Sequence, residues 1–136
     1  MYKDLIYMVT NDSNTVAAGS TVPLKTIVRR YGSAIQSSGN SVVLYKPGYY
    51  LVTATAVVSG GSAGDAVMTL QKAGQDLVGM TASETITTAS TELRTLTIDG
   101  IVRVMCYEKG VALTLINDGA ISLTTSNVSL SVDYYA

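Results

Sequence analysis

The sequence has no histidine, tryptophan or phenylalanine, and it has one cysteine. Without histidine the chain lacks the commonest general base at neutral pH and the usual zinc ligand, which excludes most hydrolase mechanisms. Cys106 cannot form an internal disulfide. Its neighbours Val104, Met105 and Tyr107 are typical of a strand, so we expect a buried, unreactive thiol. These absences predict a protein that is not an enzyme.

Charged residues are also scarce, at 14% of the chain, with nine Lys and Arg against ten Asp and Glu. Binding to nucleic acid depends on clustered basic side chains, and only Arg29 and Arg30 form even a pair, so we expect no nucleic-acid partner. Hydrophobic residues make up 47% of the sequence. A surface with so little charge indicates that apolar area is buried by self-association.

Long apolar runs are missing as well. No segment approaches the roughly 18 to 20 apolar residues that a membrane-spanning helix requires, so no membrane partner is predicted. Residues 1–14 contain Asp4 and no long apolar centre, so we expect no secretory signal and synthesis in a cytoplasm.

Motifs that would hold a metal or a cofactor are absent. The acidic residues stand mostly beside Gly, Asn, Ser or Thr, which is typical of turns. Asp65, Asp99 and Asp118 fall in predicted loops, but no calcium-binding D-x-D-x-D-G run includes them. The glycine-rich segment 60–64 lacks the Gly-Lys-Ser/Thr ending of a phosphate-binding loop. We therefore predict no metal and no cofactor.

The residues that are abundant (Val, Ile, Thr and Tyr) favour strands, and turn signals separate them at short intervals. Ser37 to Asn40 predicts a hairpin turn, and Lys72 to Gln75 predicts another. The pattern predicts an all-β, two-sheet jelly-roll sandwich of about eight to ten strands over residues 21–136. Residues 1–20 are expected to form an N-terminal arm or edge strand. Residues 81–91 are expected to form an exposed loop or edge strand.

The most regular alternation lies in residues 48–57, where neither face carries a charge and both should be covered. One face presents Tyr50, Val52, Ala54 and Ala56, and the other presents Tyr49, Leu51, Thr53, Thr55 and Val57. In the last segment, Val128, Leu130, Val132 and Tyr134 alternate with Ser129, Ser131, Asp133 and Tyr135. Such alternation is typical of a half-buried strand.

The segment Pro47-Gly48-Tyr49-Tyr50-Leu51-Val52 resembles the globular heads of complement and the tumour necrosis factor (TNF) superfamily, and the order of later strands over residues 22–136 follows it. The resemblance implies a TNF-like jelly roll that forms a homotrimer. It also implies that segments 48–55 and 128–135 line the trimer core. The expected interface residues are Tyr49, Tyr50, Leu51, Thr53, Thr55, Leu130, Val132 and Tyr134.

Residues 15–56 are similar to small proteins of bacterial prophages. This similarity implies a virion structural protein, made in the bacterial host cytoplasm, that serves as a trimeric capsid decoration or head-fibre protein. Its partners would be further copies of itself and the capsid or other virion proteins. The segment 1–20 would dock it onto the particle through Tyr2, Leu5, Ile6 and Tyr7.

A second hypothesis stays open, in which the chain is the receptor- or carbohydrate-binding tip of a phage tail fibre or baseplate. The loops expected to touch the host surface receptor or glycan are 59–65, 81–91 and 118–127. Tyrosine, of which there are nine, suits wet protein interfaces as well as sugar contacts. A depolymerase is the third and weakest hypothesis, because no acid/base constellation is present.

Overall fold

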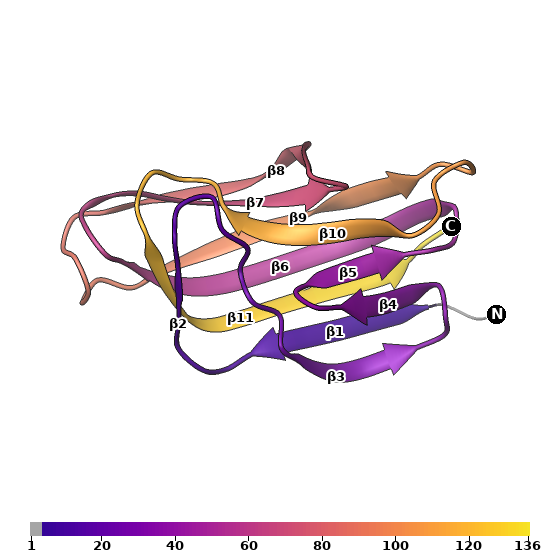
Figure 1. The fold of residues 1–136 in the computed structure, drawn as a ribbon, viewed down its shortest axis with the longest axis horizontal. Coiled ribbons are helices and arrows are strands. Elements are labelled where there is room, and N and C mark those ends of the chain that lie inside the picture. Colours follow the sequence, from indigo (N-terminus) through magenta and orange to yellow (C-terminus); the bar gives the residue numbers. More distant parts are fainter. Residues whose placement is uncertain (1–3) are drawn as a thin grey trace.

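The structure is a computed structural model that describes residues 4–136, and two β-sheets packed face to face make up its body (Figure 1). The described residues form eleven strands. These are β1 (Leu5–Thr10), β2 (Asn14–Val16), β3 (Thr26–Tyr31), β4 (Ile35–Ser38), β5 (Ser41–Leu44), β6 (Gly48–Gly60), β7 (Gly64–Lys72), β8 (Gln75–Ile86), β9 (Arg94–Val104), β10 (Val111–Asn117) and β11 (Leu123–Tyr134). The predicted all-β, two-sheet sandwich is confirmed.

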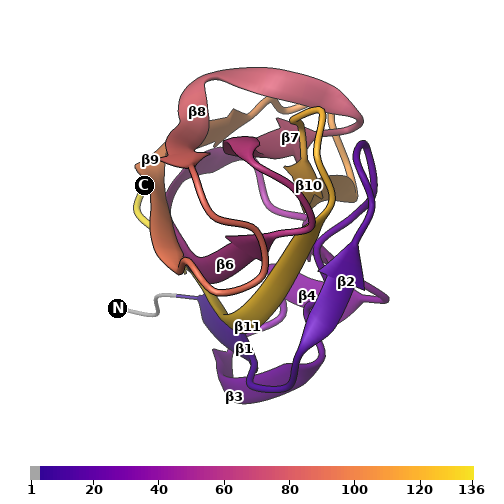
Figure 2. The ribbon, with the colours of Figure 1, turned by 90° about the vertical axis from the view of Figure 1, so that its left-hand side faces the viewer.

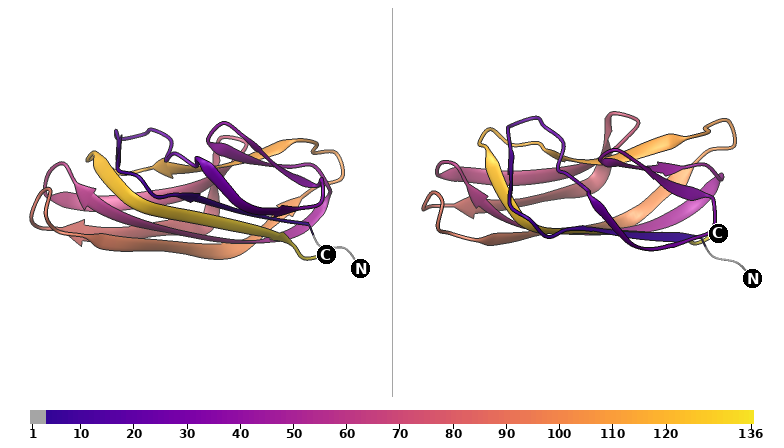
Figure 3. Two further views of the ribbon diagram at one scale, coloured as in Figure 1. Left: turned by 90° about the horizontal axis from the view of Figure 1, so that it is seen from below. Right: turned by 60° about the horizontal axis from the view of Figure 1, so that its bottom comes forward.

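The first sheet, called sheet A here, has six strands in the order β3-β1-β11-β6-β9, with β2 pairing the far end of β11. The second, sheet B, has five strands in the order β4-β5-β10-β7-β8. Views along and across the strands show the two layers, with β8 curving over the top of the sandwich (Figures 2 and 3). Neighbouring strands are antiparallel throughout both sheets.

The core lies between the sheets and follows from the period of two along each strand. On β6, Val52 and Ala54 point inward and are buried, and they share the core with Leu70 of β7 and Leu115 of β10. Burying a side chain of the size of leucine stabilises the fold by about 1.5–3 kcal/mol.

Both predicted hairpin turns are present. β4 and β5 pair around Ser38 and Ser41, and Gly39 between them has a φ of 60°. β7 and β8 are joined by Ala73 and Gly74, with φ values of 52° and 80°. Ala73 and Gly74 both have positive φ, as a type I′ hairpin turn requires, whereas in the β4–β5 turn only Gly39 does, as in a type II′ turn.

The N-terminal segment differs from the expected arm or edge strand. β1 is hydrogen-bonded on both sides, to β11 along its whole length and to β3 on the other side. Ile6 and Met8 point into the core and are buried, which ties this strand to the sandwich. The described part of segment 1–20 is therefore an integral part of sheet A, and β3 takes the edge position.

Residues 81–86 belong to β8, the edge strand of sheet B, which was one of the two alternatives for segment 81–91. The register of β8 against β7 shifts between Thr69 and Gln71, where β8 contains extra residues. Val78 lies in this bulge and is fully exposed. No helix within residues 4–136 is long and apolar enough to cross a bilayer.

Candidate functional site: the outer face of sheet A

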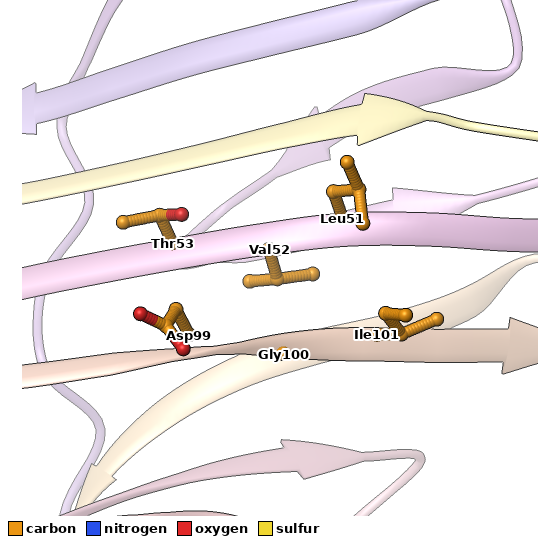
Figure 4. Close-up of a pocket in the computed structure, with 6 residues that line it drawn as sticks. All are labelled: Leu51, Val52, Thr53, Asp99, Gly100 and Ile101. Atoms are coloured by element: carbon orange, nitrogen blue, oxygen red, sulfur yellow. The ribbon is translucent and has the colours of Figure 1, made fainter.

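The outer face of sheet A carries large apolar side chains that the chain itself leaves uncovered. On β6, Leu51 points outward and is 40% exposed, while on β9 its register partner Ile101 is 61% exposed. Their side chains stand beside each other on the two neighbouring strands (Figure 4). Continuing across the sheet, Leu51 pairs with Asp133 of β11, and Asp133 pairs with Leu5 of β1.

A second row, two residues along each strand, is more polar. Thr53 of β6 pairs with Asp99 of β9 on one side and with Ser131 of β11 on the other. Ser131 in turn pairs with Tyr7 of β1, whose ring is 38% exposed. The face thus combines the apolar side chains of Leu5, Leu51 and Ile101 with hydroxyl groups and with the carboxylates of Asp99 and Asp133, a mixture of apolar and polar groups that is also found at protein interfaces.

A shallow hollow lies between these rows and is lined by Leu51, Val52, Thr53, Asp99, Gly100 and Ile101 (Figure 4). Gly100 lies between Asp99 and Ile101, and its missing Cβ would point to the inner face of β9, where it would collide with the thioether of the buried Met80 from β8. The close approach of Met80 from inside the sandwich thus favours glycine at this position.

The residues expected to line a trimer interface divide between the two faces of sheet A. Tyr49, Leu51 and Thr53 are exposed on the outer face, and Thr55 is half-buried there.

Tyr50, Leu130 and Val132 are instead completely buried between the sheets, so the expectation that they contact another subunit is corrected. Their positions alternate with the outward-facing ones along β6 and β11, which places them in the subunit core.

Tyr134 is half-buried and holds the end of β11 against β6. Its ring packs edge-to-face on Tyr50, with centroids 5.2 Å apart, and the ammonium of Lys46 lies 4.3 Å from the centroid of Tyr134. The Tyr50 hydroxyl donates to the backbone carbonyl of Lys46. Burial raises the pKa of Tyr50 to about 12, because the phenolate would lose its hydration. Tyr50 therefore has a structural role in this cluster.

The four residues predicted to dock the protein onto the particle do not share one environment. Tyr2 lies outside the described residues. Ile6 is fully buried and cannot contact a particle, whereas Leu5 and Tyr7 point to the outer face of sheet A. The structure therefore brings Leu5 and Tyr7 onto the same face as Leu51, with β11 between them.

The acidic residues and the cysteine considered as possible metal ligands or reactive groups lie in strands or turns. Asp65 and Asp99 lie in strands β7 and β9, not in loops as expected, and Asp118 accepts a hydrogen bond from the Thr69 hydroxyl. Within residues 4–136 no three metal-ligating side chains form a cluster. Cys106 is exposed, which corrects the expected buried thiol, because it lies in the turn after β9 and not in a strand.

Sequence reasoning missed two groups of exposed apolar residues. Ile101 was not predicted to lie in the interface. The alternation of Ile101 and Arg103 with Val102 and Val104 could have indicated that Ile101 points to the outer face. All six residues of β3 are exposed, including Ile27 and Val28, because this edge strand extends past the cover that sheet B provides. No sequence pattern marks that overhang.

Comparison with known proteins supports the fold alone. No family model matches the chain, and no curated protein matches it. Among solved structures, murine APRIL superposes with a TM-score of 0.71 at 13% identity, over 98% of this chain and 100% of that one. The globular domain of zebrafish complement 1qA gives 0.69 at 10% identity, over 96% and 95% of the two chains. Vertex protein P5 of PRD1 gives 0.63 at 16% identity, over 96% and 95%.

These likenesses confirm the predicted fold class. The domain is an all-β, two-sheet jelly roll of the TNF and C1q type.

Proposed function

We propose that this TNF/C1q-like domain is a structural protein of a bacteriophage particle, a homotrimeric capsid decoration or head-fibre protein. Two observations support the phage assignment. The sequence of residues 15–56 resembles small prophage proteins, and the fold resembles that of the PRD1 vertex protein, a virion component.

The observation that supports self-association is the pair of exposed apolar side chains, Leu51 and Ile101, on the outer face of sheet A. Leu51 and Ile101 expose large fractions of their side chains side by side, where an ordinary surface would place charges. A partner subunit that covers this pair would bury both side chains, each of which contributes on the order of 1 kcal/mol or more. An interface in which two different surfaces meet forms a closed ring when the rotation between neighbouring subunits closes, as three subunits around an axis do. We assign the outward-facing residues Tyr49, Leu51, Thr53 and Thr55, together with Ile101, to that interface.

Light scattering coupled to size exclusion tests the assembly. We expect a mass about three times 14.2 kDa for the purified chain. Leu51→Asp places a carboxylate in the contact and should give a monomer that keeps the β-sheet circular dichroism spectrum. Val78→Asp is the matched control, because Val78 is fully exposed in the bulge of β8, away from sheet A. A wild-type monomer, or equal dissociation of both variants, would contradict the interface.

The virion location is tested on particles purified by density gradient from a culture of the source lysogen after induction. We expect an antibody raised against the chain to detect it in the particle band and to label particles in electron micrographs. Detection only in the soluble fraction would overturn the virion role, whatever the oligomeric state.

The second function, a receptor- or glycan-binding tip, draws on the loops that meet at the end of the sandwich away from the chain termini. Ser90 donates its backbone N–H to the carbonyl of Gly60, and Gly61 donates to that of Ser122. These bonds join the β6–β7, β8–β9 and β10–β11 loops into one surface. Loss of adsorption to host cells after Ser62→Arg, with assembly intact, would favour this alternative.

A further inference from the structure

The exposed tyrosines are unevenly distributed over the molecule. Tyr45, Tyr107 and Tyr135 are 49%, 76% and 61% exposed. They lie at the end of the sandwich where the β5–β6 loop, the β9–β10 loop and the last residues of the chain meet (Figure 1). We call these three residues and their surroundings the tyrosine end. In the loops of the opposite end, among residues 4–136, Leu93 is the one exposed large hydrophobic residue.

Exposed basic side chains also gather at the tyrosine end, where the carboxylate of Asp4 accepts the backbone N–H of Ala34. Lys46, Arg103 and Lys109 are exposed there, and within the described residues none of them pairs with a carboxylate. The nearby carboxylate of Glu108 is already bound by Lys72, 3.0 Å away. Three cations among exposed tyrosines therefore favour a negatively charged partner.

The backbone of this end is held in place. Glu108 accepts the backbone N–H of Met105, and Lys72 donates both to Glu108 and to the carbonyl of Arg103. The Tyr45 ring stands against Gly110, and its N–H bonds to the carbonyl of Ala34. A surface ordered in advance loses less conformational entropy on binding.

We propose that the tyrosine end is the surface by which this protein docks onto the virion, and that it binds an acidic surface of another virion protein. This proposal rests on the proposed virion role. It assigns docking to the tyrosine end and not to the N-terminal residues that the sequence predicted. Tyrosine and arginine are the side chains most enriched at protein interfaces, which favours a protein over a sugar. Two shallow hollows in the described surface lie elsewhere, on sheet A and beside β8 and β9.

Zero-length carbodiimide cross-linking on purified particles provides the first test, because it joins only amines and carboxylates already in contact. Lys25 with Asp12 and Lys72 with Glu108 are internal positive controls, at 2.8 Å and 3.0 Å. We expect peptides that join Lys46 or Lys109 to Asp or Glu of a different virion protein. Control cross-links alone, or cross-links from these lysines to another copy of this chain, would overturn the docking surface and leave the virion role intact. Absence of the chain from particles would overturn both.

Rebinding to particles from which the protein has been released by high salt provides the second test. Lys46→Gln with Lys109→Gln removes two positive charges from the tyrosine end. Ser62→Glu with Ala120→Glu changes the net charge by the same amount in exposed loops of the opposite end. We expect the first pair to weaken rebinding about tenfold and the second to leave it unchanged.

Tyr45→Ser with Tyr107→Ser should weaken rebinding to a similar extent, and all variants should keep the wild-type mass in light scattering. Equal rebinding of every variant would overturn the proposal. Normal rebinding with lost adsorption to host cells would also overturn it and would assign the tyrosine end to a host receptor.

Discussion

In both sheets, side chains alternate between the inner and the outer face. The two outer faces differ in how far their apolar side chains are exposed to solvent. On sheet A, Leu51 and Ile101 stand open to solvent at 40% and 61% exposure. On sheet B, the outward-pointing Val43 is buried and Val67 is half-buried, with Gly119 of the β10–β11 loop packed on Val67. The chain thus packs one of its own loops on the outer face of sheet B and leaves the large apolar side chains on the outer face of sheet A exposed.

The largest expected effect is a difference in stability between substitutions on the inner face and on the outer face of sheet A. Leu130→Ala leaves a cavity in the core and should lower the free energy of unfolding by about 2–5 kcal/mol. Leu51→Ala, on the outer face, should lower it by less than about 1 kcal/mol in a dilute solution where subunits are separate. Urea denaturation followed by circular dichroism measures both. Equal losses would show that Leu51 also packs within the subunit.

The next effect compares the two outer faces directly. If a partner covers sheet A, tenfold dilution should lower the melting temperature of the wild-type chain by about a few degrees. Ile101→Ser should remove this dependence on concentration, whereas Val67→Ser should keep it, since Val67 is covered within the chain. A melting temperature independent of concentration in the wild-type chain would contradict the comparison.

A smaller effect should distinguish the two adjacent tyrosines of β6 in alkaline solution. Because the pKa of Tyr50 rises from 10.0 to about 12 on folding, its contribution to stability is complete below pH 10 and is lost as the pH rises toward 12. Tyr50→Phe should therefore flatten the loss of stability over this range, and Tyr49→Phe should not. Denaturant midpoints measured from pH 9 to pH 12 test this, and identical profiles for both variants would refute it.

The smallest effect concerns the loop that follows β9. The N–H of Met105 and the ammonium of Lys72 lower the pKa of Glu108 below 4.5, so Glu108 stabilises the fold above that pH and ceases to do so as the pH falls through its folded value. Glu108→Gln should lower the melting temperature at pH 7 and have a smaller effect at pH 3. Glu84→Gln, on exposed β8, controls for the loss of one carboxylate. An equal effect of Glu108→Gln at both pH values would argue against these contacts.

Alternation in the sequence was sufficient to predict strand β6 and the separation of its two faces. The alternation did not show which of the two faces of β6 belongs to the core. The side chains of Tyr50, Val52 and Ala54 on one face are no more apolar than those of Tyr49 and Leu51 on the other. In the structure Tyr50, Val52 and Ala54 pack between the sheets, whereas Tyr49 and Leu51 remain exposed on the outer face. For the same reason, Leu130 and Val132 were assigned to an interface when they belong to the core.

Two further differences arise from tertiary contacts that a local pattern cannot report. The apolar neighbours of Cys106 indicated a strand, but the Glu108 carboxylate binds the N–H of Met105 and turns the chain. Segment 1–20 was expected to form an arm or edge strand, but β11 and β3 pair with both sides of β1. Long-range pairing of this kind is invisible in a single sequence.

The pairing of β1 with β11 also determines when the protein can fold. Leu5 lies opposite Asp133, near the other end of the chain, and β11 stands between β1 and β6 in sheet A. A growing polypeptide on the ribosome cannot complete this sheet until its last strand has emerged. Folds dominated by such distant contacts form slowly, in milliseconds to seconds. The part of the outer face that runs from Leu5 through Asp133 to Leu51 is therefore completed only when β11 joins the sheet, whereas the contact of Leu51 with Ile101 needs β6 and β9 alone.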